Sequence, residues 1–550
     1  MKRLAITISG AVSLGAYEAG VMYELLRALE SHNANHPTDQ ILIDVLTGAS
    51  AGGMTAAILA QKLLFQPDRL REVSNNDLYL PWVKDIDLSN LLKLKADESE
   101  FLSIFSSDLV EDISKKYVVL PTTLGPNVKS PQPHSAVAPQ LKLGLAMSNL
   151  NGIDYGLKLT SGGAMPYTRF QDEVKIDIDS TNLDHIKAEF WEPIRNAAVA
   201  CGAFPFAFRV KDVLRHVSEY QDPVPLQFPA TGMHFAYTDG GTFQNEPIGL
   251  AKQLVDSIDR HQNEQRYYIF VAPGMRESAS STFSAASGSS YFDYWHTGLS
   301  LANAIFNQAR YRDLENVERI NKRIAVFNEQ AVRLKDLFLA GTINASVLRP
   351  ATTPLLNGLF QSNAETLPAT SREDALIRLR AQFLGEYQEI VRSKSQENAD
   401  AWIDAILLLE SVASLGPKDE MKIFAITENA DKLAGGSFYS FGGFFDIAYR
   451  QHDYDRGRKN VRDFIVWLNG TTDTGLGPID YPESTHAISI DSSLDGVKME
   501  SLSRSKRQSL RNRLYDRIHA FLAEIGIPAL VRGAIDIGYL DKFLDNLFAL

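Results

Sequence analysis

The sequence predicts an α/β fold: a three-layer α/β/α domain with a mostly parallel sheet, followed by an α-helical C-terminal region. In the first half, short β-rich runs alternate with helical patterns, and turns rich in small residues join them. Beyond residue 290 the pattern changes to long helical segments. Strands that alternate with helices form a parallel sheet covered on both faces. Ligands then bind at the carboxyl ends of the strands.

The elements of the first half are expected in the following order. The apolar, β-prone run at residues 4–8 predicts a buried first strand. Residues 16–30 place Val21, Leu25 and Leu29 on one face, which predicts a helix. The remaining elements are a strand at 41–46, a helix at 53–64 and strands at 141–147, 233–237 and 267–271.

Two stretches of biased composition bear on the domain organisation. The Ser/Ala/Gly-rich run at residues 278–290 has the composition of a linker. We therefore predict an α/β domain over residues 1–290 and a mainly helical extension over residues 291–550. The proline-rich stretch at residues 118–139 is incompatible with a regular helix or central strand, and predicts either a surface loop or a mobile cover over an active site.

Charge and cysteine content exclude several classes of partner. The formal net charge is -12, which argues against a nucleic-acid partner because binding to phosphates depends on Lys and Arg. The single cysteine, Cys201, rules out an intrachain disulfide and a Cys-based zinc site. A reducing, cytoplasmic location fits best. The sequence carries no signal of an oligomeric state.

Any membrane contact of this chain is expected to be peripheral. The first residues imitate a signal peptide, but cleavage would remove a glycine-bearing turn to which we assign chemistry below. No segment reaches about 18 uncharged apolar residues, the length of a membrane span. Residues 504–521 form a basic amphipathic helix pattern, typical either of a helix on a membrane surface or of a packed helix with a charged face.

The second expected strand runs directly into a G-x-S-x-G sequence, Gly48 to Gly52. In such a nucleophile elbow the serine sits in a tight, strained turn between strand and helix, and the two glycines let these elements approach. Ser50 is therefore the candidate nucleophile. The backbone N–H of Ala51, at the start of the helix, can face a developing oxyanion.

A second set of oxyanion donors is expected where the first strand ends. The turn of small residues there offers the backbone N–H groups of Gly10, Ala11 and Val12. A simple strand-to-helix turn would look the same. A dinucleotide site is disfavoured, because glycines at positions 10, 15 and 20 do not give G-x-G-x-x-G.

The candidate base is an aspartate rather than a histidine. None of the eleven histidines follows a strand into a turn of small residues. Asp239 does stand at a strand end, followed by Gly240 and Gly241, although Asp-Gly-Gly alone is a common turn.

Together, these segments resemble the patatin-like phospholipase family. The first turn, the elbow, the Asp-Gly-Gly motif followed by Asn245, and the small-residue helix pattern at residues 197–208 agree in order and spacing over roughly residues 1–275. The resemblance implies a Ser-Asp dyad of Ser50 and Asp239, lipid acyl esters as substrates, and no metal or nucleotide cofactor. Asp239 would then accept the Ser50 proton directly, at about 2.6 to 3.2 Å.

The sequence departs from the family pattern in the first turn. The run of glycines is reduced to Gly10-Ala11-Val12, and Leu14 replaces the Arg or Lys. The donors survive this change if the backbone dihedrals stay negative, but the positive charge does not. The alternatives are a weakened scaffold that binds lipid or a protein partner, and a non-lipid esterase or thioesterase.

One C-terminal stretch also resembles a segment found in this family. Residues 442–445 and 449–458 resemble a segment of larger bacterial patatin-like proteins. Its Asp and Arg side chains predict an ion-paired structural cluster rather than a second active site.

Overall fold

The computed structural model describes most of the first 275 residues and of the last 130. The described ranges are 1–93, 103–119, 132–158, 164–258 (except 206, 221 and 222), 265–275, parts of 308–406, and 421–550 with gaps at 437–439, 473, 483–485, 525, 530–531 and 533–539. Two earlier predictions therefore lie outside the described residues: the linker and domain boundary near residue 290, and most of the proline-rich loop.

The chain forms two compact units. The first contains Met1–Leu314 together with Lys422–Leu550, and the second contains Glu315–Met421. The last 129 residues thus share a unit with the α/β domain. In the second unit the longest described helix is α8 (Ala345–Ser362).

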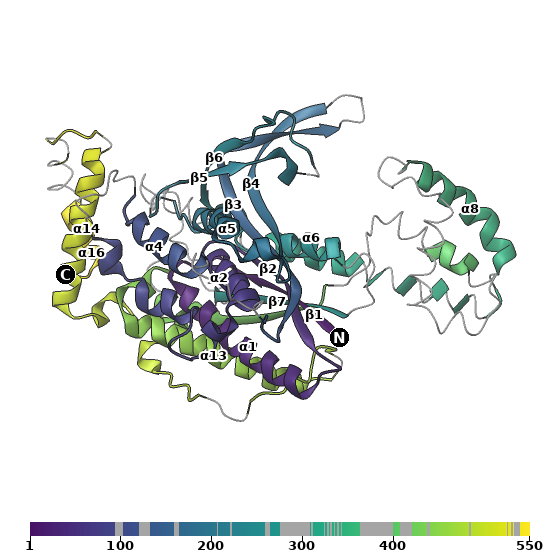
Figure 1. Cartoon of the computed structure of the whole chain (residues 1–550), viewed down its shortest axis with the longest axis horizontal. Helices are drawn as coiled ribbons and strands as arrows, with labels where there is room; N and C mark the ends of the chain where they lie inside the picture. Colours follow the sequence, from purple (N-terminus) through teal and green to yellow (C-terminus); the bar gives the residue numbers. More distant parts are fainter. Residues whose placement is uncertain are drawn as a thin grey trace, which may run out of the picture. The chain divides into compact units, whose positions relative to one another are not determined.

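The first unit is built on an eight-stranded, mixed sheet in which most neighbours of the central strands are parallel (Figure 1). The strand order is β5-β6-β3-β2-β1-β7-β8, and β4 pairs with β3. Parallel pairs join β3, β2, β1, β7 and β8, whereas β4, β5 and β6 pair antiparallel. The strands are β1 (Lys2–Ile8), β2 (Ile41–Gly48), β3 (Val137–Lys158), β4 (Ala164–Asp179), β5 (Lys211–Arg215), β6 (Met233–Asp239), β7 (Gln265–Met275) and β8 (Ile423–Asn429).

Helices complete the predicted three-layer α/β/α arrangement. They include α1 (Gly15–Asn35), α2 (Ala51–Phe65), α4 (Ser107–Val118), α5 (Ala188–Cys201) and α6 (Ile248–Ile258). The apolar β1 and β2 are almost wholly buried, as parallel strands covered on both faces are. The predicted strands at 4–8, 41–46, 141–147, 233–237 and 267–271 are all confirmed, as are the two helices.

The C-terminal region adds two elements to this domain that the sequence did not predict. Strand β8 extends the sheet beside β7. Helix α13 (Ile447–Gly470) lies along α1, as the lower part of Figure 1 shows. A Cβ at Gly20 would lie 2.0 Å from the Tyr454 carbonyl oxygen, so the two backbones approach closely only because that residue is glycine.

The basic pattern near the C-terminus forms helix α14 (Arg504–Glu524), and its arginines are engaged within the protein. Arg517 is fully buried and donates to the Ile104 carbonyl at 2.9 Å, Arg513 donates to the Ser89 carbonyl, and Arg511 pairs with Asp541. These contacts favour the packed helix over the membrane-surface helix. Among the described helices, none has the length and apolar character needed to cross a bilayer.

Candidate active site

Ser50 occupies a strained turn between β2 and α2. Its backbone dihedrals are φ 52° and ψ -127°, a region that side-chain-bearing residues rarely adopt and that costs about 1 to 3 kcal/mol. The flanking glycines are required by close approach. A Cβ at Gly48 would lie 2.4 Å from the Gly52 carbonyl oxygen, and a Cβ at Gly52 would lie 2.4 Å from that of Ile8. The predicted elbow geometry is therefore present.

Asp239 reaches the same edge of the sheet from the end of β6. The Ser50 hydroxyl donates to Asp239 Oδ2 at 2.6 Å. The other carboxylate oxygen accepts the Gly241 N–H at 2.6 Å, and the Asp239 carbonyl accepts the Ser148 hydroxyl at 2.8 Å. Because backbone and side chain are both held, the carboxylate is fixed toward the serine. Among the described histidines, none hydrogen-bonds to either side chain.

The Asp239 carboxylate is buried with an exposed fraction of 1%. Burial raises its pKa to about 7, against the opposing effect of the hydrogen bonds from Ser50 and the Gly241 N–H. A base with a pKa near the working pH can both accept a proton from an alcohol and return it to a leaving group. The electrostatics of this carboxylate are thus suited to general acid–base chemistry.

The four predicted oxyanion donors differ in availability. The Gly10 N–H already donates to the Asn245 carbonyl at 2.9 Å, which corrects its assignment as an oxyanion donor. A Cβ at position 10 would lie 2.1 Å from Asn245 Oδ1, so glycine is needed there for this close contact. For the N–H groups of Ala11, Val12 and Ala51, the described part of the chain provides no hydrogen-bond acceptor.

Val12 has an unexpected backbone conformation. Its φ is +52°, so the expectation that the dihedrals of this turn stay negative is wrong at this position. The turn takes the left-handed conformation that glycine adopts freely, and a β-branched residue is strained in it. The neighbouring Ala11 has φ -145° and carries no such strain.

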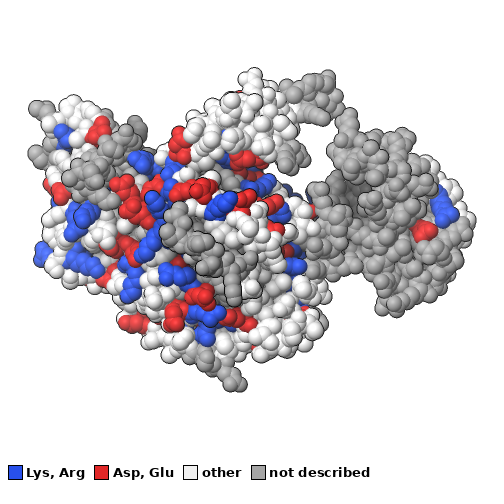
Figure 2. All heavy atoms as spheres, viewed as in Figure 1, with Lys and Arg blue, Asp and Glu red and all other residues white. Residues whose placement is uncertain are grey.

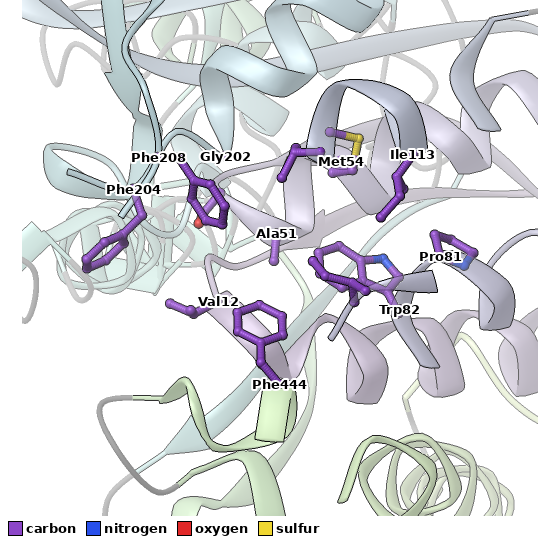
Figure 3. A pocket seen from close by; sticks show the side chains of 13 residues that line it. Val12, Ala51, Met54, Pro81, Trp82, Ile113, Gly202, Phe204, Phe208 and Phe444 are labelled. Atoms are coloured by element: carbon purple, nitrogen blue, oxygen red, sulfur yellow. The ribbon is translucent and has the colours of Figure 1, made fainter. Parts of the chain in front are cut away.

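An apolar pocket opens beside Ser50 (Figure 3). Val12 and Ala51 lie at the serine end, and aromatic and aliphatic side chains form the walls. The main wall residues are Met54, Trp82, Ile113, Phe204, Phe208 and Phe444. The cavity volume is ≈ 60 Å³. Such a pocket suits a hydrocarbon chain attached to a group that reacts at the serine.

Phe444 is a pocket residue that the sequence analysis did not assign to the site. It lies in the Gly-Gly-Phe-Phe segment, for which the family resemblance implies no chemical role. Leu14, which stands where the family has a cation, is buried against the same C-terminal region, because a Cβ at Gly435 would lie 2.7 Å from it.

The Asp and Arg side chains of α13 form the predicted ion-paired cluster. Arg458 is buried and donates to Glu24 of α1 at 2.9 Å and to Asp455 at 2.8 Å. Arg462 also pairs with Glu24, at 2.7 Å. This cluster joins α13 to α1 and takes no part in the pocket.

Within the described residues, one group of side chains could converge on a metal ion. Ligand atoms of His32, His36 and Asp480 lie within 4.8 Å of one another. His32 lies in the last turn of α1 and His36 directly follows that helix, so both precede β2, whereas Ser50 follows the other end of that strand. The group therefore belongs to the edge of the sheet opposite the Ser50–Asp239 pair, where His36 is already bonded to Asp480 at 2.9 Å.

The α/β part of the chain matches the sequence model of a known protein family. Residues 6–252 match the sequence model of the family described as Patatin-like phospholipase. Uncharacterized protein y4iI of Sinorhizobium fredii is 23% identical over 541 residues, which cover 87% of this chain and 66% of that protein. The crystal structure of VipD from Legionella pneumophila aligns over 96% of this chain and 93% of its own, with 10% identity and a TM-score of 0.22.

Proposed function

We propose that this chain hydrolyses acyl esters of membrane lipids through Ser50 and Asp239, because residues 6–252 match the model of the patatin-like phospholipase family, a family of lipid acyl hydrolases. The observation that carries this proposal is the 2.6 Å hydrogen bond from the Ser50 hydroxyl to a buried carboxylate, beside an apolar pocket that Ser50 helps to line. Nucleophile, base and a chain-binding cavity meet at one edge of the sheet.

The reaction begins when Ser50 Oγ attacks the ester carbonyl carbon while Asp239 Oδ2 takes the hydroxyl proton. The carbonyl oxygen becomes an oxyanion, which the backbone N–H of Ala51 and those of Ala11 and Val12 stabilise. Asp239 then returns the proton to the departing alcohol oxygen, leaving an acyl ester on Ser50. Water, deprotonated by Asp239, attacks this ester and releases the fatty acid and the free serine.

The walls of the pocket support an acyl chain as the bound part of the substrate. They are formed by aliphatic and aromatic side chains from α2, α4 and the segments near Trp82 and Phe204. Binding a hydrocarbon chain against such walls is favourable by about 25 cal/mol for each Å² of apolar surface removed from water. A polar head group would remain outside the pocket, on the leaving-group side of the ester.

We further propose that the β3–β4 hairpin makes the peripheral contact with the lipid surface. Strand β3 pairs with β2 up to Leu145 and with β6 at Asp239, and then continues past this catalytic edge. On the projecting part, the exposed fractions of Leu157, Met165 and Tyr167 are 50%, 48% and 40%.

These three side chains share one face of the hairpin, since Leu157 pairs with Met165 and Tyr167 lies two residues further along β4. Figure 2 shows the projecting hairpin, at the top of the view, mostly without charge. An exposed apolar face on a hairpin that projects past the edge of the sheet carrying Ser50 and Asp239 suits contact with a bilayer surface rather than with water.

The dyad is tested by a fluorophosphonate probe and by product analysis on mixed phospholipid vesicles. We expect the wild type to be labelled on Ser50 and to release fatty acids. Ser50→Ala should abolish both, and Asp239→Asn should abolish turnover with the fold retained, as measured by circular dichroism. Ser218→Ala is a control that removes an exposed serine hydroxyl outside the pocket.

Three outcomes would contradict parts of the proposal. Fatty-acid release that persists in Ser50→Ala would refute the dyad. A labelled wild-type protein that cleaves thioesters or short soluble esters but no lipid would indicate the non-lipid hydrolase. A wild type that resists the probe would indicate a scaffold that binds without turnover.

A further inference from the structure

We propose that Phe444, supplied by the C-terminal part of the chain, sets the length of the acyl chain that the site accepts. This inference rests on the proposed function and assigns a role to residues that the family match, which ends at residue 252, does not cover. Phe444 lies in the short 3-10 helix η11 (Gly442–Phe445), just before α13.

The Phe444 ring forms part of the pocket wall near the elbow. Its exposed fraction is 3%, and it lies below Ala51 and next to Val12 in Figure 3. The cavity it bounds, ≈ 60 Å³, has room for only a few methylene-sized groups. An acyl chain attached to Ser50 therefore meets this ring early along its length.

Aromatic contacts hold the wall in place. The ring centroid of Phe441 is 6.1 Å from that of Phe444, 5.5 Å from that of Phe204 and 5.8 Å from that of Phe105, each in an edge-to-face arrangement. Such pairs add to the free energy gained by burial. The two C-terminal rings, Phe441 and Phe444, therefore belong to one aromatic cluster with Phe105 and Phe204 of the α/β domain.

Hydrogen bonds tie the same segment to the turn that carries the oxyanion donors. The Ser13 hydroxyl donates to the Ser440 carbonyl at 2.5 Å and accepts the Gly443 N–H at 2.9 Å. The buried Arg450 donates to the Gly443 carbonyl at 2.9 Å and to the Val83 carbonyl at 3.0 Å, beside Trp82. A wall anchored at this many points is a rigid limit on the chain rather than a loose cover.

The size of the effect follows from hydrocarbon burial. Each methylene that gains a buried position strengthens binding about fourfold. Replacing the Phe444 ring with a methyl group should admit two or three more carbons. We therefore expect Phe444→Ala to raise the kcat/KM ratio of long to short esters at least tenfold, and Phe444→Trp to lower it.

The experiment measures kcat/KM of p-nitrophenyl esters with saturated chains of increasing length. Phe445→Ala is the matched control, because this neighbouring ring packs against Phe548 instead of lining the pocket. Circular dichroism and fluorophosphonate labelling verify that each variant is folded and has a reactive serine. A length profile of Phe444→Ala that coincides with those of the wild type and the control would overturn the proposal.

A binding measurement separates this inference from the proposed function. Calorimetry measures the affinity of saturated fatty acids for the Ser50→Ala protein, with and without Phe444→Ala. Because Ser50→Ala removes turnover, this affinity depends on the pocket alone. If the wild type cleaves no ester but Phe444→Ala still shifts the preferred fatty acid to longer chains, the hydrolase proposal fails and the role of Phe444 stands. If the wild type is active but neither measurement depends on Phe444, the hydrolase proposal stands and the role of Phe444 fails.

Discussion

Asp239→Asn should remove activity and at the same time stabilise the protein at neutral pH. In the native state the pKa of Asp239 is raised to about 7 by burial, whereas its ordinary value is 3.8. Between these values the native carboxyl holds a proton that the unfolded chain has released. The native state thus binds more protons, and the stability that this residue contributes is lost as the pH rises from about 4 to about 7.

The magnitude follows from the difference between the two pKa values. One pKa unit corresponds to about 1.4 kcal/mol, so a difference of about three units amounts to roughly 4 kcal/mol above pH 7. An asparagine removes this cost, because it carries no charge to bury. We therefore expect the stability advantage of Asp239→Asn to be small at pH 4, to grow as the pH rises and to level off near pH 7.

Urea denaturation of the wild type and Asp239→Asn at pH 4.5, 6 and 8 measures this dependence. The midpoint difference between the two proteins should increase across the series. Asp516→Asn is the control, because that aspartate of α14 is exposed to solvent and carries no burial cost. An advantage of Asp239→Asn that stays constant with pH would refute the reasoning that burial governs this carboxylate.

Three further predictions concern the rest of the site. The kcat/KM of the wild type should fall about tenfold per pH unit below pH 7, because Asp239 must be ionised to accept the serine proton; a flat profile down to pH 5 would contradict this. Val12→Gly should relieve the strain at φ +52° and raise stability by about 1 kcal/mol in urea denaturation, after the entropy cost of glycine is subtracted. Leu157→Asp should weaken sedimentation with phospholipid vesicles several-fold, whereas Val466→Asp, an exposed apolar position on α13, should leave it unchanged.

The sequence was sufficient to predict those features of the structure that depend on the local pattern of residues. The apolar run of β1 and the turn around Ser50 determine their own conformations through side-chain periodicity and glycine placement. Asp239 was found because a strand end and a short turn also leave local marks. The 2.6 Å contact between the two side chains arises because β6, which pairs antiparallel with the extension of β3, ends at the edge of the sheet where β2 also ends.

What the sequence did not reveal depends on contacts between distant segments. Residues 423–429 have β-prone side chains, but nothing local indicates that they pair with β7, about 150 positions earlier. The engagement of the Gly10 N–H by Asn245 and the positive φ of Val12 likewise arise from packing around the turn. Phe444 could have been suspected from the Gly-Gly-Phe-Phe motif, since two glycines before an aromatic pair allow a close approach.

The position of β8 has a consequence for how this protein is made. Ser50 and Asp239 are synthesised long before residues 423–470, so a nascent chain holds both side chains while β7 still has an open edge and α1 lacks its partner helix. Unpaired strand edges recruit other chains. Fragments that stop after the α/β half should therefore aggregate during expression, and the surroundings of Ser50 and Asp239 should become fully packed only once residues 423–470 have been added.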